Sequence, residues 1–109
     1  MDVDFLPSCF GDPALQLATT LVVNNHLAVD AGCLGFADAE TQAAVSDVVL
    51  THAHMDHVAT LPFYAVNRLQ DGLGPARIHA PADVLEMVRE GLFNDRLWPD
   101  LERLSTPEE

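Results

Sequence analysis

Short blocks of apolar and polar residues alternate along the chain, and this pattern predicts alternating strands and helices. Two β-prone runs, Thr20 to Val23 and His26 to Asp30, flank Asn24-Asn25. Asparagine tolerates the positive φ angles that a two-residue hairpin turn requires. Upstream, Asp4 to Cys9 is expected to form a first strand, followed by the turn sequence Phe10-Gly11-Asp12-Pro13. The N-terminal part therefore predicts a strand and then a β-hairpin.

The middle of the chain predicts a turn, a short helix and a buried strand. Asp30-Ala31-Gly32 is expected to end the hairpin, because glycine allows a sharp backbone turn. A helix over Ala39 to Val45 follows, with the Asp38 carboxylate as its cap and Ser46-Asp47 as its end. Val48 to Thr51 is too apolar for a solvated face, which predicts a strand buried on both sides.

The remainder of the chain predicts helix, strand and helix. The first helix is expected to begin at a Thr60 cap, with Pro62 in its first turn, and to end near Asp71-Gly72. Ala76 to Ala80 is then expected as a strand, and Pro81 to open the second helix. Four apolar residues fall on one face of that helix, which indicates core packing: Val84, Leu85, Val88 and Leu92.

This alternation predicts an α/β (α+β) chain with helices packed on a sheet, forming one domain over residues 1–109. A chain of 109 residues is long enough for one modest domain. In such folds the functional loops lie at the carboxyl ends of strands. Asp30 and the segment that follows Thr51 both take that position.

The charge of the chain narrows the classes of ligand. It carries 17 acidic residues against five arginines, with no lysine, for a formal net charge of −12. This charge argues against binding a nucleic acid polymer. A small anionic substrate would need a local positive charge at its site, such as a metal ion.

The N-terminal sequence and the two cysteines indicate the cellular compartment in which we expect the protein. No apolar run approaches the roughly 18 residues of a membrane span, and the acidic N-terminus does not resemble a secretory signal. We expect a cytoplasmic protein without a membrane partner. Cys9 and Cys33 are expected as buried thiols, with a disulfide as the less favoured alternative. A third interpretation places both in loops near the histidines.

Three histidines and one aspartate stand within six positions directly after the predicted buried strand: His52, His54, Asp56 and His57. Imidazole and carboxylate groups are the ligands that zinc, iron or manganese prefer. Side chains alternate in an extended backbone, so His52 and His54 can hold one ion, while Asp56 and His57 follow a bend and favour a second. Asp56 as the cap of the next helix is an alternative that can coexist with metal binding.

At these residues the sequence resembles a known family. His52-Ala53-His54-Met55-Asp56-His57, with Asp30-Ala31-Gly32 upstream, is similar to the His-x-His-x-Asp-His signature and Asp-x-Gly turn of the metallo-β-lactamase superfamily. Further stretches resemble the class II cyclic-nucleotide phosphodiesterases and their bacterial relatives. These stretches are Leu6 to Cys9, His57 to Phe63, Leu92 to Asn94 and Leu97 to Asp100.

The resemblance implies the N-terminal half of a four-layer αββα sandwich with two divalent metal ions, zinc first and iron or manganese as alternatives. It implies that His52 and His54 bind the first ion, and that Asp56 and His57 bind the second. Asp56 is also the residue assigned to catalysis. Asp30 would orient a ligand histidine through its free ring N–H. The implied activity is hydrolysis of a 3′,5′-cyclic nucleotide, cAMP or cGMP, by a metal-bridging hydroxide.

The superfamily pattern has further ligands, which this chain does not reach: two histidines and a bridging aspartate. The remaining histidines, His26 and His79, match no ligand position of the family. We therefore expect a truncated domain that self-associates or pairs with a complementary C-terminal half. Two alternatives stay open: a non-catalytic metal-binding or interaction remnant, and another hydrolase of the metallo-β-lactamase fold.

Overall fold

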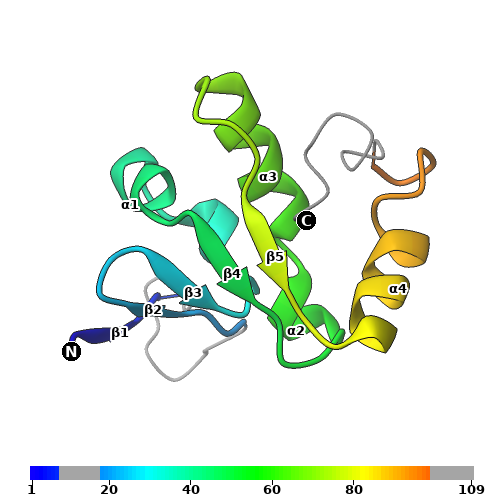
Figure 1. The fold of residues 1–109 in the computed structure, drawn as a ribbon, viewed down its shortest axis with the longest axis horizontal. Helices are drawn as coiled ribbons and strands as arrows, with labels where there is room; N and C mark the ends of the chain where they lie inside the picture. The colour runs from blue at the N-terminus through cyan, green and yellow to red at the C-terminus, as the bar shows by residue number, and fades with distance from the viewer. Residues whose placement is uncertain (8–17, 99–109) are drawn as a thin grey trace.

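The computed structural model describes residues 1–7 and 18–98. Its strands form one five-stranded mixed sheet in the order β1-β2-β3-β4-β5 (Figure 1). β1 to β3 pair antiparallel, whereas β3, β4 and β5 pair parallel. The strand bounds are β1 Val3–Phe5, β2 Leu21–Val23, β3 Leu27–Val29, β4 Asp47–Val49 and β5 Arg77–His79. The predicted single sheet with flanking helices is confirmed.

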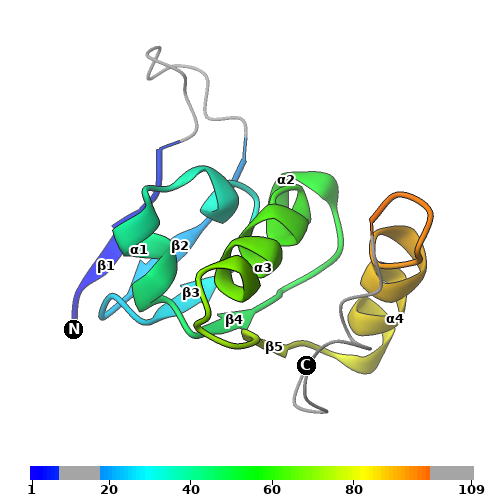
Figure 2. The same ribbon diagram turned by 90° about the horizontal axis from the view of Figure 1, so that it is seen from above.

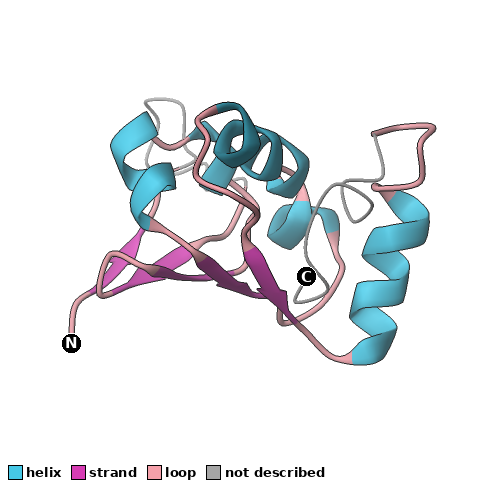
Figure 3. Cartoon of the chain, turned by 45° about the horizontal axis from the view of Figure 1, so that its top comes forward, coloured by secondary structure: helices cyan, strands magenta, loops and turns pink. Residues whose placement is uncertain are grey.

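The helices gather on one side of this sheet. Figures 2 and 3 show α1, α2 and α3 over one face, while α4 lies beyond the edge formed by β5. None of the described helices is long and apolar enough to span a membrane. The helix bounds are η1 Leu34–Phe36, α1 Ala39–Ala44, α2 Met55–Val58, α3 Leu61–Gln70 and α4 Ala82–Gly91. The sequence did not indicate η1 or α2, which are too short to show a periodic pattern.

The hairpin forms where the asparagine pair predicted it. Asn24 and Asn25 have φ angles of 51° and 65°, in the left-handed region that asparagine tolerates. Val23 pairs with Leu27, so three residues separate the paired ends instead of the predicted two. The first strand is shorter than predicted, and Cys9 and the turn at 10–13 lie outside the described residues.

The two predicted helix caps have different outcomes. Asp38 caps α1 as predicted, since its Oδ1 accepts a hydrogen bond from the Thr41 amide at 2.8 Å. Thr60 precedes α3, but its side chain makes no cap. Its hydroxyl donates to the Ala31 carbonyl at 2.8 Å and accepts from the Gly35 amide at 2.8 Å. A contact with the loop after β3 has replaced the local cap.

The core lies between the sheet and the helices. Val22, Ala28 and Val48 face the helices and are buried, and α4 adds Val84 and Val88 to the core as predicted. Leu85 and Leu92, from the same predicted face of α4, are half-buried.

The prediction that β4 is buried on both sides is wrong, because Asp47 and Val49 are only half-buried while Val48 is fully buried. Figure 3 shows α1, α2 and α3 over one face of the sheet, and the burial of Val48 in the core places its side chain on that face. The other face, here called the outer face, carries side chains from neighbouring strands that are also half-buried: Leu21, Val23, Leu27 and Val29.

Candidate metal centre

The four predicted ligand residues lie in the connection between β4 and α3. The chain leaves β4 through Leu50, whose amide donates to the carbonyl of His79 at 2.9 Å. His54 is the N-terminal flanking residue of α2 and has extended backbone angles, φ −67° and ψ 146°. Asp56 lies in the first turn of α2, and no side chain caps this helix. The helix that follows, α3, also has no side-chain cap hydrogen bond at its N-terminus, so the alternative that Asp56 caps it is wrong.

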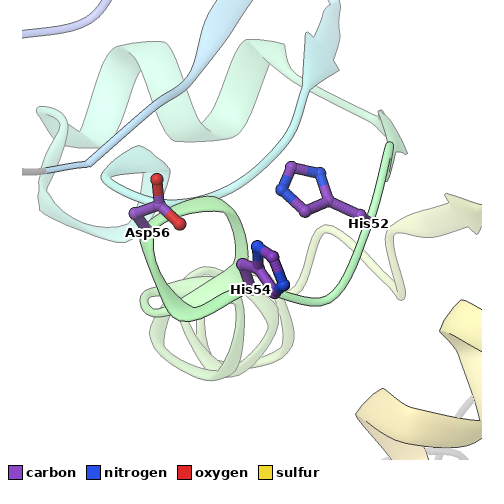
Figure 4. Close-up of side chains that lie close together, drawn as sticks. All are labelled: His52, His54 and Asp56. Carbon is purple, nitrogen blue, oxygen red and sulfur yellow. The ribbon is translucent and has the colours of Figure 1, made fainter.

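The side chains of this segment converge. One ligand atom each from His52, His54 and Asp56 lies within 4.8 Å of the other two, and Figure 4 shows the three side chains close together. The ring centroids of His52 and His57 are 4.0 Å apart, and those of His52 and His54 are 4.7 Å apart. Nε2 of His57 is 3.3 Å from Oδ2 of Asp56. Asp56 is thus close to His52 and His54 as well as to His57.

These donor atoms fit a divalent cation. Two ligand atoms that bind one tetrahedral zinc ion at 2.0–2.1 Å are about 3.3 Å apart, and Asp56 Oδ2 and His57 Nε2 have a separation of 3.3 Å. The 4.8 Å spread of the His52, His54 and Asp56 atoms is wider. Imidazole and carboxylate donors together suit zinc, iron or manganese.

Asp30 supports this segment from the end of β3. It is 3% exposed and has a φ of 66°, a backbone conformation that is uncommon outside glycine. Its Oδ2 is 2.7 Å from Nδ1 of His57, and its Oδ1 accepts the amide hydrogen of Thr51 at 2.8 Å. The structure thus contains the contact that the expected orienting role of Asp30 requires.

Gly32 allows the turn after Asp30 to approach α2, the helix that carries Asp56 and His57. A Cβ atom at this position would be 2.0 Å from the carbonyl oxygen of Asp56 and 2.6 Å from the amide of Thr19. That Thr19 amide donates to the Asp56 carbonyl at 2.7 Å, and the Ala31 amide donates to the His57 carbonyl at 2.7 Å. The sequence indicated a sharp turn at Gly32 but not this contact between distant segments.

His26 and His79 lie outside this group. His26 is exposed in the hairpin turn, with Nδ1 2.9 Å from the carbonyl of Asn24. His79 is on β5, with Nε2 3.0 Å from Oδ1 of Asp47. The hydrogen bond from His79, followed by that from Ser46, lowers the pKa of Asp47. Both histidines have local partners and neither joins the metal-ligand cluster.

Cys33 directly follows the Asp30–Gly32 turn and is a buried free thiol. Burial raises the pKa of this thiol, although the hydrogen bond with Thr20 acts in the opposite direction. A protonated buried thiol is a poor nucleophile. This agrees with the expected buried thiol for Cys33, while Cys9 lies outside the described residues.

Comparison with known proteins identifies the family. The model of one family, described as cAMP phosphodiesterases class-II, matches residues 23–107. This range includes Asp30 and the four converging residues from His52 to His57. A search of curated proteins gave no match. Because the match extends over most of its length, the chain belongs to the class-II cAMP phosphodiesterase family of the metallo-β-lactamase superfamily.

Proposed function

We propose that this chain supplies the metal-binding loop of a metal-dependent phosphodiesterase that hydrolyses a 3′,5′-cyclic nucleotide, cAMP first. The single observation that carries the proposal is the convergence of three imidazoles and one carboxylate at the carboxyl end of β4. Packing of apolar side chains does not account for this cluster, because His54 and Asp56 are exposed. The family match gives the substrate class.

Each residue of the cluster has a distinct task in this proposal. His52 and His54 hold one divalent ion, and Asp56 and His57 hold the other. We assign Asp56 to catalysis, because its carboxylate lies close to His52 and His54 of the first ion and to His57 of the second. Asp30 orients His57 through its Nδ1. When bound, the paired ions polarise the phosphoryl oxygen and activate water for attack on phosphorus.

Electrostatics support the need for cations. A cyclic nucleotide carries one negative charge, and the chain has a formal net charge of −12. The protein field therefore opposes substrate approach at long range. Divalent ions in the cluster reverse the sign of the local field where the phosphodiester must lie. Zinc is the ion we favour for this donor set, with iron and manganese as alternatives.

A second candidate function is metal binding without catalysis. Two catalytic zinc ions require about three protein ligands each, whereas four ligand side chains converge in the described residues. We propose that a second copy or a complementary segment provides the missing ligands in the active enzyme. Without it, the loop binds metal but does not hydrolyse substrate.

The first experiment measures zinc uptake by equilibrium dialysis and elemental analysis. We expect His54→Ala to lose most of the bound zinc, because it removes one of the converging imidazoles. His26→Ala is the matched control, since His26 is an exposed histidine of the hairpin turn. Equal zinc content in the two variants would overturn the assignment of the site.

The second experiment separates the two candidate functions. Zinc-loaded protein is incubated with cAMP, and formation of AMP is followed by chromatography. Hydrolysis that is lost in His54→Ala supports the enzyme. Zinc binding without AMP formation, also when a complementary C-terminal segment is supplied, supports the non-catalytic candidate.

A further inference from the structure

Thr51 stands between Asp30 and His52. Its hydroxyl Oγ1 is 2.8 Å from Oδ2 and 3.0 Å from Oδ1 of Asp30. The same oxygen is 2.9 Å from Nδ1 of His52. A single hydroxyl therefore contacts both the buried carboxylate and one of the proposed metal ligands.

The direction of these hydrogen bonds follows from the number of available protons. A carboxylate only accepts, so the one proton of the Thr51 hydroxyl is donated to Asp30. The hydroxyl oxygen can then only accept from His52, which requires a hydrogen on Nδ1 of that ring. A neutral His52 with a hydrogen on Nδ1 has its lone pair on Nε2. This is the nitrogen left free to bind a metal ion.

The tautomer of His57 is fixed in the same way, but by a direct contact with Asp30. Its Nδ1 lies 2.7 Å from Oδ2 of Asp30, so Nδ1 donates, and in the neutral ring Nε2 carries the lone pair. Nε2 of His57 is the nitrogen that lies 3.3 Å from Asp56. One carboxylate thus acts on two imidazoles, on His57 directly and on His52 through Thr51.

We propose that Thr51 is a positioning residue, which transmits the orienting effect of Asp30 to His52 and fixes the tautomer that presents Nε2 to the metal. The proposal rests on the metal site proposed above. It adds that the two imidazoles are prepared together, although they are assigned to different ions. A ligand already in the correct tautomer and orientation loses less freedom on binding.

The structure permits a clean test of the hydroxyl. The backbone amide of Thr51 also donates to Oδ1 of Asp30 at 2.8 Å, and this bond remains when the side chain changes. Thr51→Val keeps the shape of the side chain and replaces the hydroxyl with a methyl group, which makes no hydrogen bond. Thr51→Ser keeps the hydroxyl and removes the methyl group. His57 serves as an internal control, because its bond with Asp30 does not involve Thr51.

The tautomers can be measured in the metal-free protein from the ring ¹⁵N shifts of its histidines, which distinguish the Nδ1–H, the Nε2–H and the doubly protonated forms. We expect hydrogen on Nδ1 of both His52 and His57. In Thr51→Val, His52 should move toward the Nε2–H form while His57 stays unchanged, and Thr51→Ser should restore His52. Hydrogen on Nε2 of His52 in the unmodified chain, or no change in Thr51→Val, would overturn the proposal.

Zinc affinity, measured by competition with a chromogenic chelator, provides the second readout. We expect Thr51→Val to bind zinc about 10-fold more weakly or worse, with Thr51→Ser close to the unmodified chain. Unchanged affinity in Thr51→Val would refute the positioning role even if the tautomer changed. Absence of zinc binding in the unmodified chain would refute the proposed metal site instead, and the ring shifts would still decide whether Thr51 controls His52.

Discussion

At the scale of residues, Asp30 shows what a sequence motif does and does not reveal. The identity and spacing of the histidines and Asp56 predicted the ligand cluster, and the family resemblance implied that Asp30 orients one of its histidines. The contacts of Thr51 with Asp30 and of Gly32 with Asp56 were not predicted, because each joins segments that are more than 20 positions apart. Threonine and glycine are common in loops, so their residue types alone indicate no partner.

Gly32→Ala should displace the turn after Asp30 from α2, the helix that carries Asp56 and His57. The added Cβ would overlap the carbonyl of Asp56, a backbone atom that cannot rotate away. The turn must then separate from α2, which moves Asp30 away from His57 and weakens zinc binding by about 10-fold or more. Dialysis against zinc measures this, with Gly91→Ala as control because a Cβ added at Gly91 would meet no atom within 4 Å. Similar losses in both variants would contradict the explanation.

Asp38→Ala should lower the melting temperature in a manner that depends on pH. The hydrogen bond from the Thr41 amide lowers the pKa of Asp38 in the folded chain. A lowered folded-state pKa stabilises the fold above the unfolded pKa of about 3.9, and this contribution is lost as pH falls through the folded-state value. The difference from the unmodified chain should therefore be constant near neutral pH and shrink in acid.

The matched control for this cap is Asp38→Asn, which retains a side-chain acceptor without a titrating group. Thermal melts followed by circular dichroism across the acidic range compare the three chains. Asp38→Asn should be more stable than Asp38→Ala at every pH. A gap between the unmodified chain and Asp38→Ala that is as large in strong acid as at neutral pH would contradict the assigned role of the carboxylate.

At the scale of elements, α1 and α3 are joined by a buried arginine. Arg68 of α3 is 7% exposed, and its Nη1 donates to the carbonyls of Val45 at 2.8 Å and Ala43 at 3.2 Å. The Tyr64 hydroxyl donates to the same Val45 carbonyl. Cations near the C-terminal end of a helix are favourable, since the last carbonyls lack helical partners. An arginine in a helix is usually exposed, so the sequence could not indicate this position.

Arg68→Met should destabilise the fold by about 2–3 kcal/mol, because carbonyls at the end of α1 lose a charged donor in a buried place. Arg77→Met is the control, since the Arg77 side chain is 65% exposed and its Nη1 lies 4.0 Å from Asp47. An exposed ion pair of this kind contributes about 0–1 kcal/mol. Urea unfolding measures both, and equal midpoints for the two variants would contradict the buried link.

Element boundaries were less predictable than element types. Every strand in the described part of the chain has three residues, fewer than predicted for β1, β2, β3, β4 and β5 alike. Apolar runs continue beyond the paired residues, as in Leu50, which is buried although it follows β4. Burial in a loop therefore has the same sequence pattern as burial in a strand.

At the scale of the whole molecule, the two faces of the sheet differ in their surroundings. Val48 is fully buried under the helices, while Val29 on the outer face of the adjacent strand is half-buried. The sequence could not distinguish the faces, because both carry apolar side chains. The alternation of buried and half-buried positions along β2, β3 and β4 depends on which face the helices cover.

Substitution by a charged residue on each face of the sheet should show which face is buried. Val48→Glu is expected to unfold the chain, because burial of an unpaired carboxylate costs several kcal/mol against a total stability of about 5–15 kcal/mol. Val29→Glu should leave the far-ultraviolet circular dichroism and the urea midpoint nearly unchanged, since the carboxylate can reach water. Unfolding of both variants would show that the outer face is also covered in solution.

The order of the strands has a consequence for how the chain acquires its structure. Each of the described strands from β2 to β5 pairs with the strand that precedes it, so every pairing joins neighbours in the chain. Pairings between nearby segments lose little chain entropy on closure and favour rapid folding. During synthesis on the ribosome, the sheet can form one strand at a time, starting from β1. Each new strand can then pair with a strand that has already been synthesised.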